Sequence, residues 1–230
     1  MPRSPRPQAD TSATDRLIEA AEALYGERGL DGVSLRQISV AAGSGNNYAV
    51  QYHFGDAGGL IRAILEKRTP ELERRRAQLL ATVKEDGRLG DSRALMEILY
   101  RPLIDHVDAQ GKRSYARFIL ALNSSPAALP HVIGQFRLMP ISDHVLDLLQ
   151  LANPTLPRLL VAERQRLIAI MVLTSIFHRY GPFQPEAFDP AVIDNALDMA
   201  TAAITAPMSS AVGEMMGEIA ASRAPRSPPA

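Results

Sequence analysis

The feature that most limits the fold is the period of the apolar residues, which follow a helical spacing along almost the whole chain. One example is the apolar stripe of the first predicted helix, Leu17, Ile18, Ala21, Leu24 and Tyr25. Segments that alternate with period two are few and β-branched clusters are scarce, so we expect no sheet. The length of 230 residues therefore predicts an all-α protein of one large or two small helical domains.

Charge and cysteine content exclude several classes of protein. The 25 basic side chains balance the 25 acidic ones, so a nucleic-acid partner would need a local motif. The absence of cysteine excludes disulfides, thiol catalysis and cysteine-ligated metal. The longest apolar run, Leu167 to Phe177, is too short to span a bilayer, and residues 1–10 do not read as a secretory signal. We expect a cytoplasmic location and no membrane partner.

Glycine and proline residues divide the chain into a series of predicted helices. Ser34 is expected to cap a short helix, and Pro70 to break or kink a long helix that begins near Ala57. The predicted helices cover approximately residues 14–29, 34–42, 46–53, 57–83, 91–108, 112–123, 131–138, 141–152, 158–180, 189–205 and 208–222.

Residues 34–53 carry the spacing of a helix-turn-helix, in which the second helix enters the major groove of DNA. Amides such as Asn47 and Gln51 can pair with adenine edges, and tyrosines can reach phosphates or thymine methyls. Taken alone, the Asn46-Asn47 pair also fits a simple turn and cap. The candidate DNA-binding residues are Ser34, Arg36, Gln37, Ser44, Gly45, Asn46, Asn47, Tyr48, Gln51, Tyr52 and His53.

The stretch LIEAAEALYGERGLDGVSLRQISVAAGSGNNYAVQYHFGDAGGLIRAIL resembles the N-terminal domain of the TetR family of transcriptional regulators. It contains an amphipathic first helix, a Ser-capped second helix, an Ala-Gly turn and a recognition helix that ends in Tyr-His-Phe. The matching residues are Leu24, Tyr25, Gly29, Ser34, Leu35, Ile38, Ala42, Gly43, Tyr52, His53, Phe54 and Leu60. The segment NNYAVQYHFG is similar to one subgroup of that family.

The resemblance implies a three-helix DNA-binding head followed by a larger helical domain for ligand binding and dimerisation. The expected segments are a flexible arm at 1–13, the head at 14–67, the larger domain at 68–222 and a disordered tail at 223–230. Such a regulator, most often a repressor, binds a palindromic operator in double-stranded DNA, and a small-molecule effector controls that binding.

The resemblance also implies a homodimer through the helices near 158–180 and 189–205. The apolar faces of these helices could equally belong to the core of one monomer. The residues on the two faces are Leu160, Leu167, Ile168, Met171, Val172 and Ile176, and then Val192, Ile193, Leu197, Ala200 and Ile204.

A pocket in the larger domain would combine large apolar groups with a few polar ones. The candidates are Tyr100, Leu103, His106, Tyr115, Phe118, Leu122, Phe136, Met139, Met171, Ser175 and His178. His106 and its acidic neighbours Asp105 and Asp108 cannot share one helix face, so we expect no metal site. The charged run from Glu71 to Arg76 is expected to be a solvated helix surface.

Two departures from the resemblance keep an alternative open. Ala57 stands where a phosphate-binding lysine usually starts the fourth helix, and residues 1–62 carry slightly more acidic than basic side chains. The alternative is a helical adaptor or small-molecule-binding protein with weakened or lost DNA binding. No hydrolase elbow, zinc-protease motif or nucleotide-binding glycine loop is present in the sequence, so we expect no enzyme, no catalytic residue and no cofactor.

Overall fold

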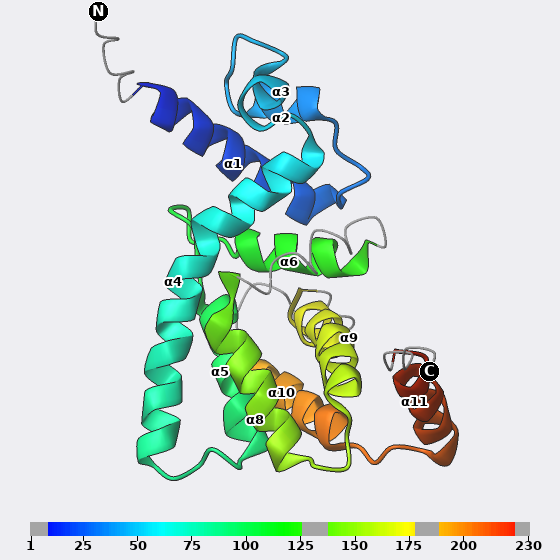
Figure 1. The fold of residues 1–230 in the computed structure, drawn as a ribbon. Helices are drawn as coiled ribbons and strands as arrows, with labels where there is room; N and C mark the ends of the chain where they lie inside the picture. Colours follow the sequence, from blue (N-terminus) through cyan, green and yellow to red (C-terminus); the bar gives the residue numbers. More distant parts are fainter. Residues whose placement is uncertain (1–8, 126–137, 178–188, 224–230) are drawn as a thin grey trace, which may run out of the picture.

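The structure is a computed structural model that describes residues 9–125, 138–177 and 189–223. Every regular element in these ranges is a helix, which confirms the predicted all-α class (Figure 1). The helices are α1 Ala9–Arg28, α2 Leu35–Ala41, α3 Ala49–Phe54, α4 Ala57–Glu85, α5 Ser92–Asp105, α6 Ser114–Ser124, α8 Pro140–Ala152, α9 Arg158–Phe177, α10 Pro190–Thr205 and α11 Ser210–Arg223.

The first three helices gather around the beginning of α4 at one end of the molecule (Figure 1). Ile38 of α2, Val50 of α3 and Leu60 of α4 are completely buried there, and the apolar stripe of α1 packs against them with Leu24 only partly buried. Helices as short as α2 and α3 are not stable alone in water, so this shared apolar contact holds them in place.

Helix α4 joins this end of the molecule to the larger bundle. Pro70 lies inside the helix and does not break it, contrary to one of the two predicted outcomes. A proline here removes one backbone hydrogen bond and crowds the preceding turn, which bends a helix. Figure 1 shows that α4 changes direction along its length. The kinked alternative is therefore the one observed.

The N-terminal helices rest on α6. Gly26 of α1 permits the close approach, because a Cβ at this position would lie 2.9 Å from Arg117 Cβ and 3.2 Å from Phe118 N. Beside this contact the Tyr25 and Phe118 rings pack with their centroids 6.3 Å apart. One continuous hydrophobic cluster therefore extends from the N-terminal helices into α6.

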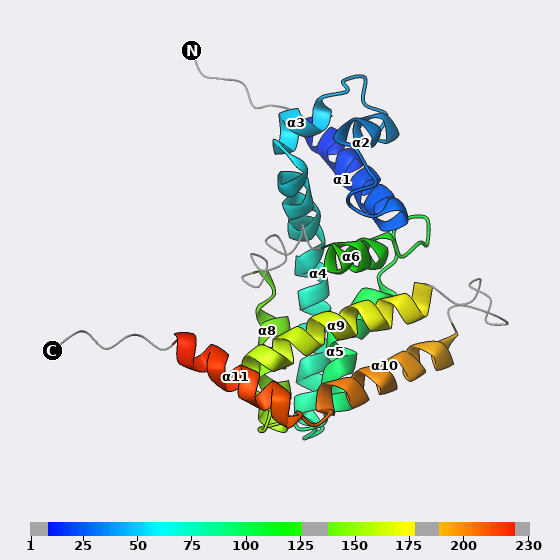
Figure 2. The same ribbon diagram turned by 90° about the vertical axis from the view of Figure 1, so that its right-hand side faces the viewer.

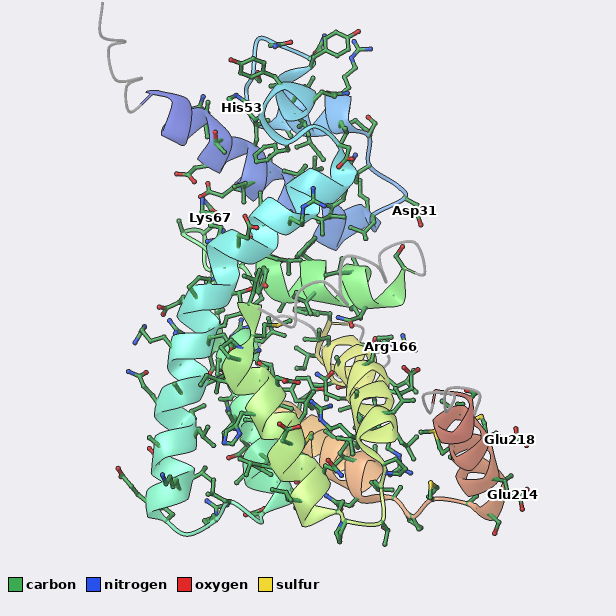
Figure 3. All side chains as sticks on the ribbon, viewed as in Figure 1. Asp31, His53, Lys67, Arg166, Glu214 and Glu218 are labelled. Atoms are coloured by element: carbon green, nitrogen blue, oxygen red, sulfur yellow. The ribbon has the colours of Figure 1, made fainter. Side chains whose placement is uncertain are left out.

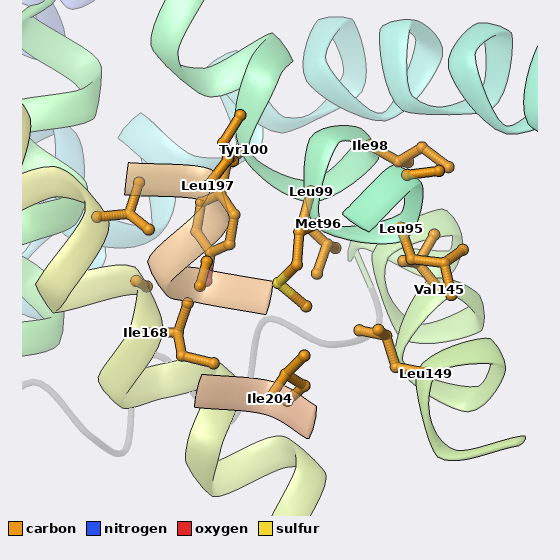
Figure 4. Packing of buried hydrophobic residues seen from close by; sticks show 14 of the residues in the cluster. Leu95, Met96, Ile98, Leu99, Tyr100, Val145, Leu149, Ile168, Leu197 and Ile204 are labelled. Carbon is orange, nitrogen blue, oxygen red and sulfur yellow. The ribbon is translucent and has the colours of Figure 1, made fainter. Parts of the chain in front are cut away.

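A second hydrophobic cluster fills the larger bundle between α5, α8, α9 and α10 (Figure 4). Met96 and Leu149 are buried in it, as is Leu197 of α10. The predicted apolar faces of α9 and α10 lie largely against each other inside this chain, since Ile168, Val172, Ile176, Ile193, Leu197, Ala200 and Ile204 are all members of the cluster. Figure 2 shows α9 and α10 side by side.

The start of the first helix differs from its prediction. Helix α1 begins at Ala9 and not near Thr14, because no proline or glycine interrupts the sequence between Pro7 and Gly26. The helix predicted at 131–138 lies outside the described residues except for Leu138, and so does the tail beyond Arg223.

In the described part of the chain, no helix is long and apolar enough to cross a membrane.

Candidate functional site

The helix-turn-helix begins with a reciprocal cap on α2. The Gln37 amide N–H donates to Ser34 Oγ at 3.3 Å, and the Ser34 amide N–H donates to Gln37 Oε1 at 2.8 Å. These two bonds form the capping box of a helix N-terminus. Ser34, Arg36 and Gln37 are all exposed, and the side chains of Ser34 and Gln37 are the two engaged in the cap.

The turn between the two short helices is held by its own polar side chains. Gly43 has φ of 67°, a backbone conformation that glycine adopts without strain. Ser44 Oγ donates to the Asn46 carbonyl at 3.1 Å, and Asn46 Oδ1 accepts from the Tyr48 amide at 2.9 Å. Gly45 is exposed with no neighbouring atoms close to its missing side chain. Ser44 and Asn46 therefore shape the turn.

Helix α3 is shorter than predicted. It begins at Ala49, so Asn46 and Asn47 precede it, and the prediction that both lie within the helix is wrong. The Asn46 side chain competes with helical hydrogen bonding by accepting from the backbone two residues on, which favours a turn. The backbone of Asn46 and Asn47 thus has the geometry of a simple turn, as the alternative interpretation of this pair expected.

Side chains on the outer face of α3 point to solvent. Tyr48 and Tyr52, one helical turn apart, are 71% and 69% exposed, and Asn47 and Gln51 are exposed beside them. We call Asn47, Tyr48, Gln51 and Tyr52 the α3 outer face. His53 is half-buried at the end of the helix, with its ring 4.9 Å from that of Tyr52 (Figure 3). Two large exposed aromatic rings, one at the N-cap of this short helix and one within it, are typical of a binding surface.

Acidic side chains of α1 are paired with basic side chains of α4. Lys67 Nζ lies 2.8 Å from Asp15 and 3.4 Å from Glu19, and Arg68 Nε lies 2.7 Å from Glu22 (Figure 3). Lys67 and Arg68 lie beyond residue 62, so the count of charges over residues 1–62 did not include them. Asp15, Glu19 and Glu22 therefore face α4 and are compensated, so they oppose a polyanion less than the sequence count implies.

The described part of the chain contains a cavity of about 120 Å³ between α4, α5, α6, α8 and α9. It is lined by Leu65, Thr69, Leu72, Arg76, Leu99, Tyr100, Leu103, Tyr115, Ile119, Leu122, Asn123, Met139, Ser142, Leu146, Gln165 and Ala169. Burial raises the pKa of Tyr115 to about 12, and burial likewise raises the pKa of Tyr100. Both phenols are therefore neutral near pH 7.

The predicted pocket residues divide into three groups. Those that line the cavity are Tyr100, Leu103, Tyr115, Leu122 and Met139. Phe136 and His178 lie outside the described residues.

The remaining predicted pocket residues lie elsewhere. Phe118 packs between Tyr25 and Tyr115 in the first cluster, and Met171 packs against the second cluster. The Ser175 hydroxyl donates to the Val172 carbonyl at 2.8 Å, as is common for a helical serine. The His106 ring lies edge-on to the Tyr115 ring with centroids 6.0 Å apart. None of these four side chains is among those that line the cavity.

Sequence reasoning missed a buried charged pair, of which Arg76 lines the cavity. Glu71, Arg74 and Arg75 form the expected surface pairs, but Glu73 and Arg76 are each only 7% exposed. This part of the prediction for the Glu71–Arg76 run is wrong. The signal was the helical spacing, because positions 73 and 76 share a face with Thr69 and Leu72.

The Glu73–Arg76 pair connects three helices. Arg76 donates from Nη1 to Glu73 Oε1 at 3.0 Å and from Nη2 to the Leu99 carbonyl of α5 at 3.0 Å. Glu73 Oε2 accepts from the Ile141 amide at the start of α8 at 2.7 Å. The charges are thus paired and hydrogen-bonded, as buried ions must be.

Within the described ranges, no group of three or more His, Asp or Glu side chains is arranged to hold a metal ion. No protein-family model and no curated protein matches the chain. Among solved structures, the chain is similar to a candidate TetR-family transcriptional regulator from Mesorhizobium loti, with 14% sequence identity and a TM-score of 0.46 over 87% of this chain and 98% of that chain.

Proposed function

We propose that the protein is a DNA-binding transcriptional regulator of the TetR type, with a head at residues 14–67 and a ligand-binding and dimerisation domain at 68–222. The observation that carries this proposal is the α3 outer face, which presents Tyr48 and Tyr52 to solvent at the end of a capped helix-turn-helix. In that motif the second helix lies in the major groove, and the first helix crosses the backbone, where Arg36 can meet a phosphate.

The position of the cavity supports control by a small molecule. Leu65, Thr69, Leu72 and Arg76 give α4 a large share of the cavity wall, and the same helix supports the head through Leu60. An effector that fits one arrangement of α4 better than another shifts the protein toward that arrangement by the difference in affinity. A cavity of about 120 Å³ suits a compact effector, since an engineered cavity of ~150 Å³ holds benzene.

The dimer belongs to the same proposal. Leu159 and Leu167 of α9 and Met199 of α10 remain exposed after the chain has formed its own core. A two-fold dimer through these helices places two heads on one face of DNA, which matches the symmetry of a palindromic operator. The proposed location of this regulator is the cytoplasm. Sedimentation of the full chain at micromolar concentration should give the mass of two copies.

A titration of the full chain against a labelled duplex from the DNA that flanks its gene tests the function. We expect saturable binding that unlabelled competitor of unrelated sequence does not displace, and that weakens as salt rises. Absence of binding at low salt favours the alternative of a helical small-molecule-binding protein. Ala57 is the observation behind that alternative, because α4 begins there without a lysine for a phosphate.

A further inference from the structure

The α3 outer face and its surroundings contain no charged side chain over a long stretch. Between Gln37 and Asp56 the sequence has no Lys, Arg, Asp or Glu, which covers most of α2, the turn and all of α3. The Asp56 carboxylate caps the start of α4, because its Oδ1 accepts from the Gly59 amide at 2.7 Å. A reading surface on α3 must therefore recognise bases with neutral groups.

The neutral groups that are present have a defined preference. Asn and Gln pair in a bidentate way with adenine N6 and N7, whereas the common guanine contact needs Arg or Lys. Asn47 and Gln51 are exposed and four residues apart, and Tyr48 and Tyr52 are their exposed neighbours. Aromatic rings pack well against the thymine methyl, which is the partner of an adenine on the opposite strand.

Only one of the two adjacent asparagines is available for this contact. Asn46 Oδ1 accepts from the Tyr48 backbone amide at 2.9 Å, and the backbone N–H of Asn46 donates to Ser44 Oγ at 3.2 Å, so the turn engages the side-chain oxygen and the backbone of Asn46. An adenine needs both the oxygen and the nitrogen of the amide, so Asn46 cannot serve it without opening the turn. The Asn47 side chain is exposed and forms no hydrogen bond with the described residues.

From these observations we infer that the protein selects A·T base pairs beneath α3, read by the amides of Asn47 and Gln51 and by the rings of Tyr48 and Tyr52. The inference rests on the proposed function and specifies its DNA partner. A half-site recognised in this way contains adenines at two positions in the major groove and requires no guanine there.

Selection of random duplexes by the full-length chain tests the inference. We expect an inverted repeat whose half-sites hold A·T pairs at the positions under α3. For Gln51→Arg, the preference at one position of each half-site should change from adenine to guanine by roughly tenfold or more, because arginine binds guanine in a bidentate way. Asn47→Ala should lose the adenine preference at the other position by a similar factor.

Gln78→Arg is the matched control, because this substitution adds the same positive charge at an exposed position on the distant half of α4. This variant should select the wild-type sequence. A wild-type half-site that demands guanine under α3, or a Gln51→Arg variant with unaltered preference, overturns the inference while leaving DNA binding intact. Failure to enrich any duplex, by contrast, overturns the proposed function itself. Circular dichroism of each variant establishes that the helices are retained.

Discussion

Arg68 of α4 donates through Nε to the carboxylate of Glu22 in α1 across 2.7 Å, and the Glu22 side chain is 1% exposed. The Ser114 hydroxyl at the start of α6 donates to the other oxygen of the same carboxylate at 2.9 Å. One buried carboxylate thereby connects α1, α4 and α6. These three helices meet where the N-terminal helices pack against the larger bundle.

Glu22→Ala should destabilise the protein strongly. Removing one partner of a buried pair leaves the other charge uncompensated and costs about 3–5 kcal/mol, although the partial exposure of Arg68 lowers the expected loss to roughly half of that. Urea denaturation followed by circular dichroism measures the change. Glu19→Ala, which removes a more exposed carboxylate from the same helix, should have a much smaller effect.

Gly59→Ala should destabilise the end of the molecule that holds α3. A Cβ at Gly59 would lie 2.0 Å from the Phe54 carbonyl oxygen, so α3 and α4 would have to separate. Overpacking of this kind costs about 1–3 kcal/mol. Gly90→Ala is the control, because its Cβ would meet no atom within 4 Å. Equal melting temperatures for the two variants would contradict the close contact between α3 and α4.

Arg76→Met should destabilise the cavity wall. Glu73 would keep its bonds to the start of α8 but would lose the buried cation that compensates its charge, at a cost of about 3–5 kcal/mol. The paired change Glu73→Gln with Arg76→Met should recover part of this loss, because no unpaired charge then remains. A double-mutant cycle by thermal or urea unfolding measures the coupling. Additive effects would contradict a direct interaction.

His106 should make stability depend on pH. Burial, followed by the nearby Arg68 cation, lowers the pKa of His106 below its ordinary value of 6.5, and Nε2 is buried without a hydrogen-bond partner among the described residues. The unfolded chain therefore takes up a proton at a higher pH than the folded chain does. The contribution of His106 to stability is complete above about pH 6.5 and is lost as pH falls toward the folded pKa.

Unfolding free energies of the wild type and His106→Leu between pH 5 and pH 7.5 measure this effect. The wild type should lose more stability than the variant as the pH decreases, because leucine does not titrate. Parallel pH profiles for the two proteins would assign the dependence to other groups.

The sequence predicted helix positions well where apolar spacing and caps coincide. Ser34 caps α2 as expected, and α4 begins at Ala57. The start of α3 was missed because the bond from the Tyr48 amide to Asn46 depends on local geometry that residue types do not reveal.

Tertiary pairing explains the other differences. Glu73 and Arg76 look like solvated residues in a charged run, yet the fold brings the Leu99 carbonyl and the start of α8 to them. The cavity likewise depends on which faces of five helices converge. Phe118 and Tyr115 are three residues apart on α6, but only Tyr115 reaches the cavity, while Phe118 fills the contact with α1.

The most direct test of the central claim compares the wild type with a Tyr48→Ala, Tyr52→Ala double variant by fluorescence anisotropy against the duplex that flanks the gene. Leu151→Ala is the control, since Leu151 is 75% exposed on α8, away from the head. We predict that the wild type and the control bind with equal affinity and that the double variant, still folded and of unchanged mass in solution, loses at least tenfold in affinity. Equal binding by all three proteins would contradict DNA recognition through α3.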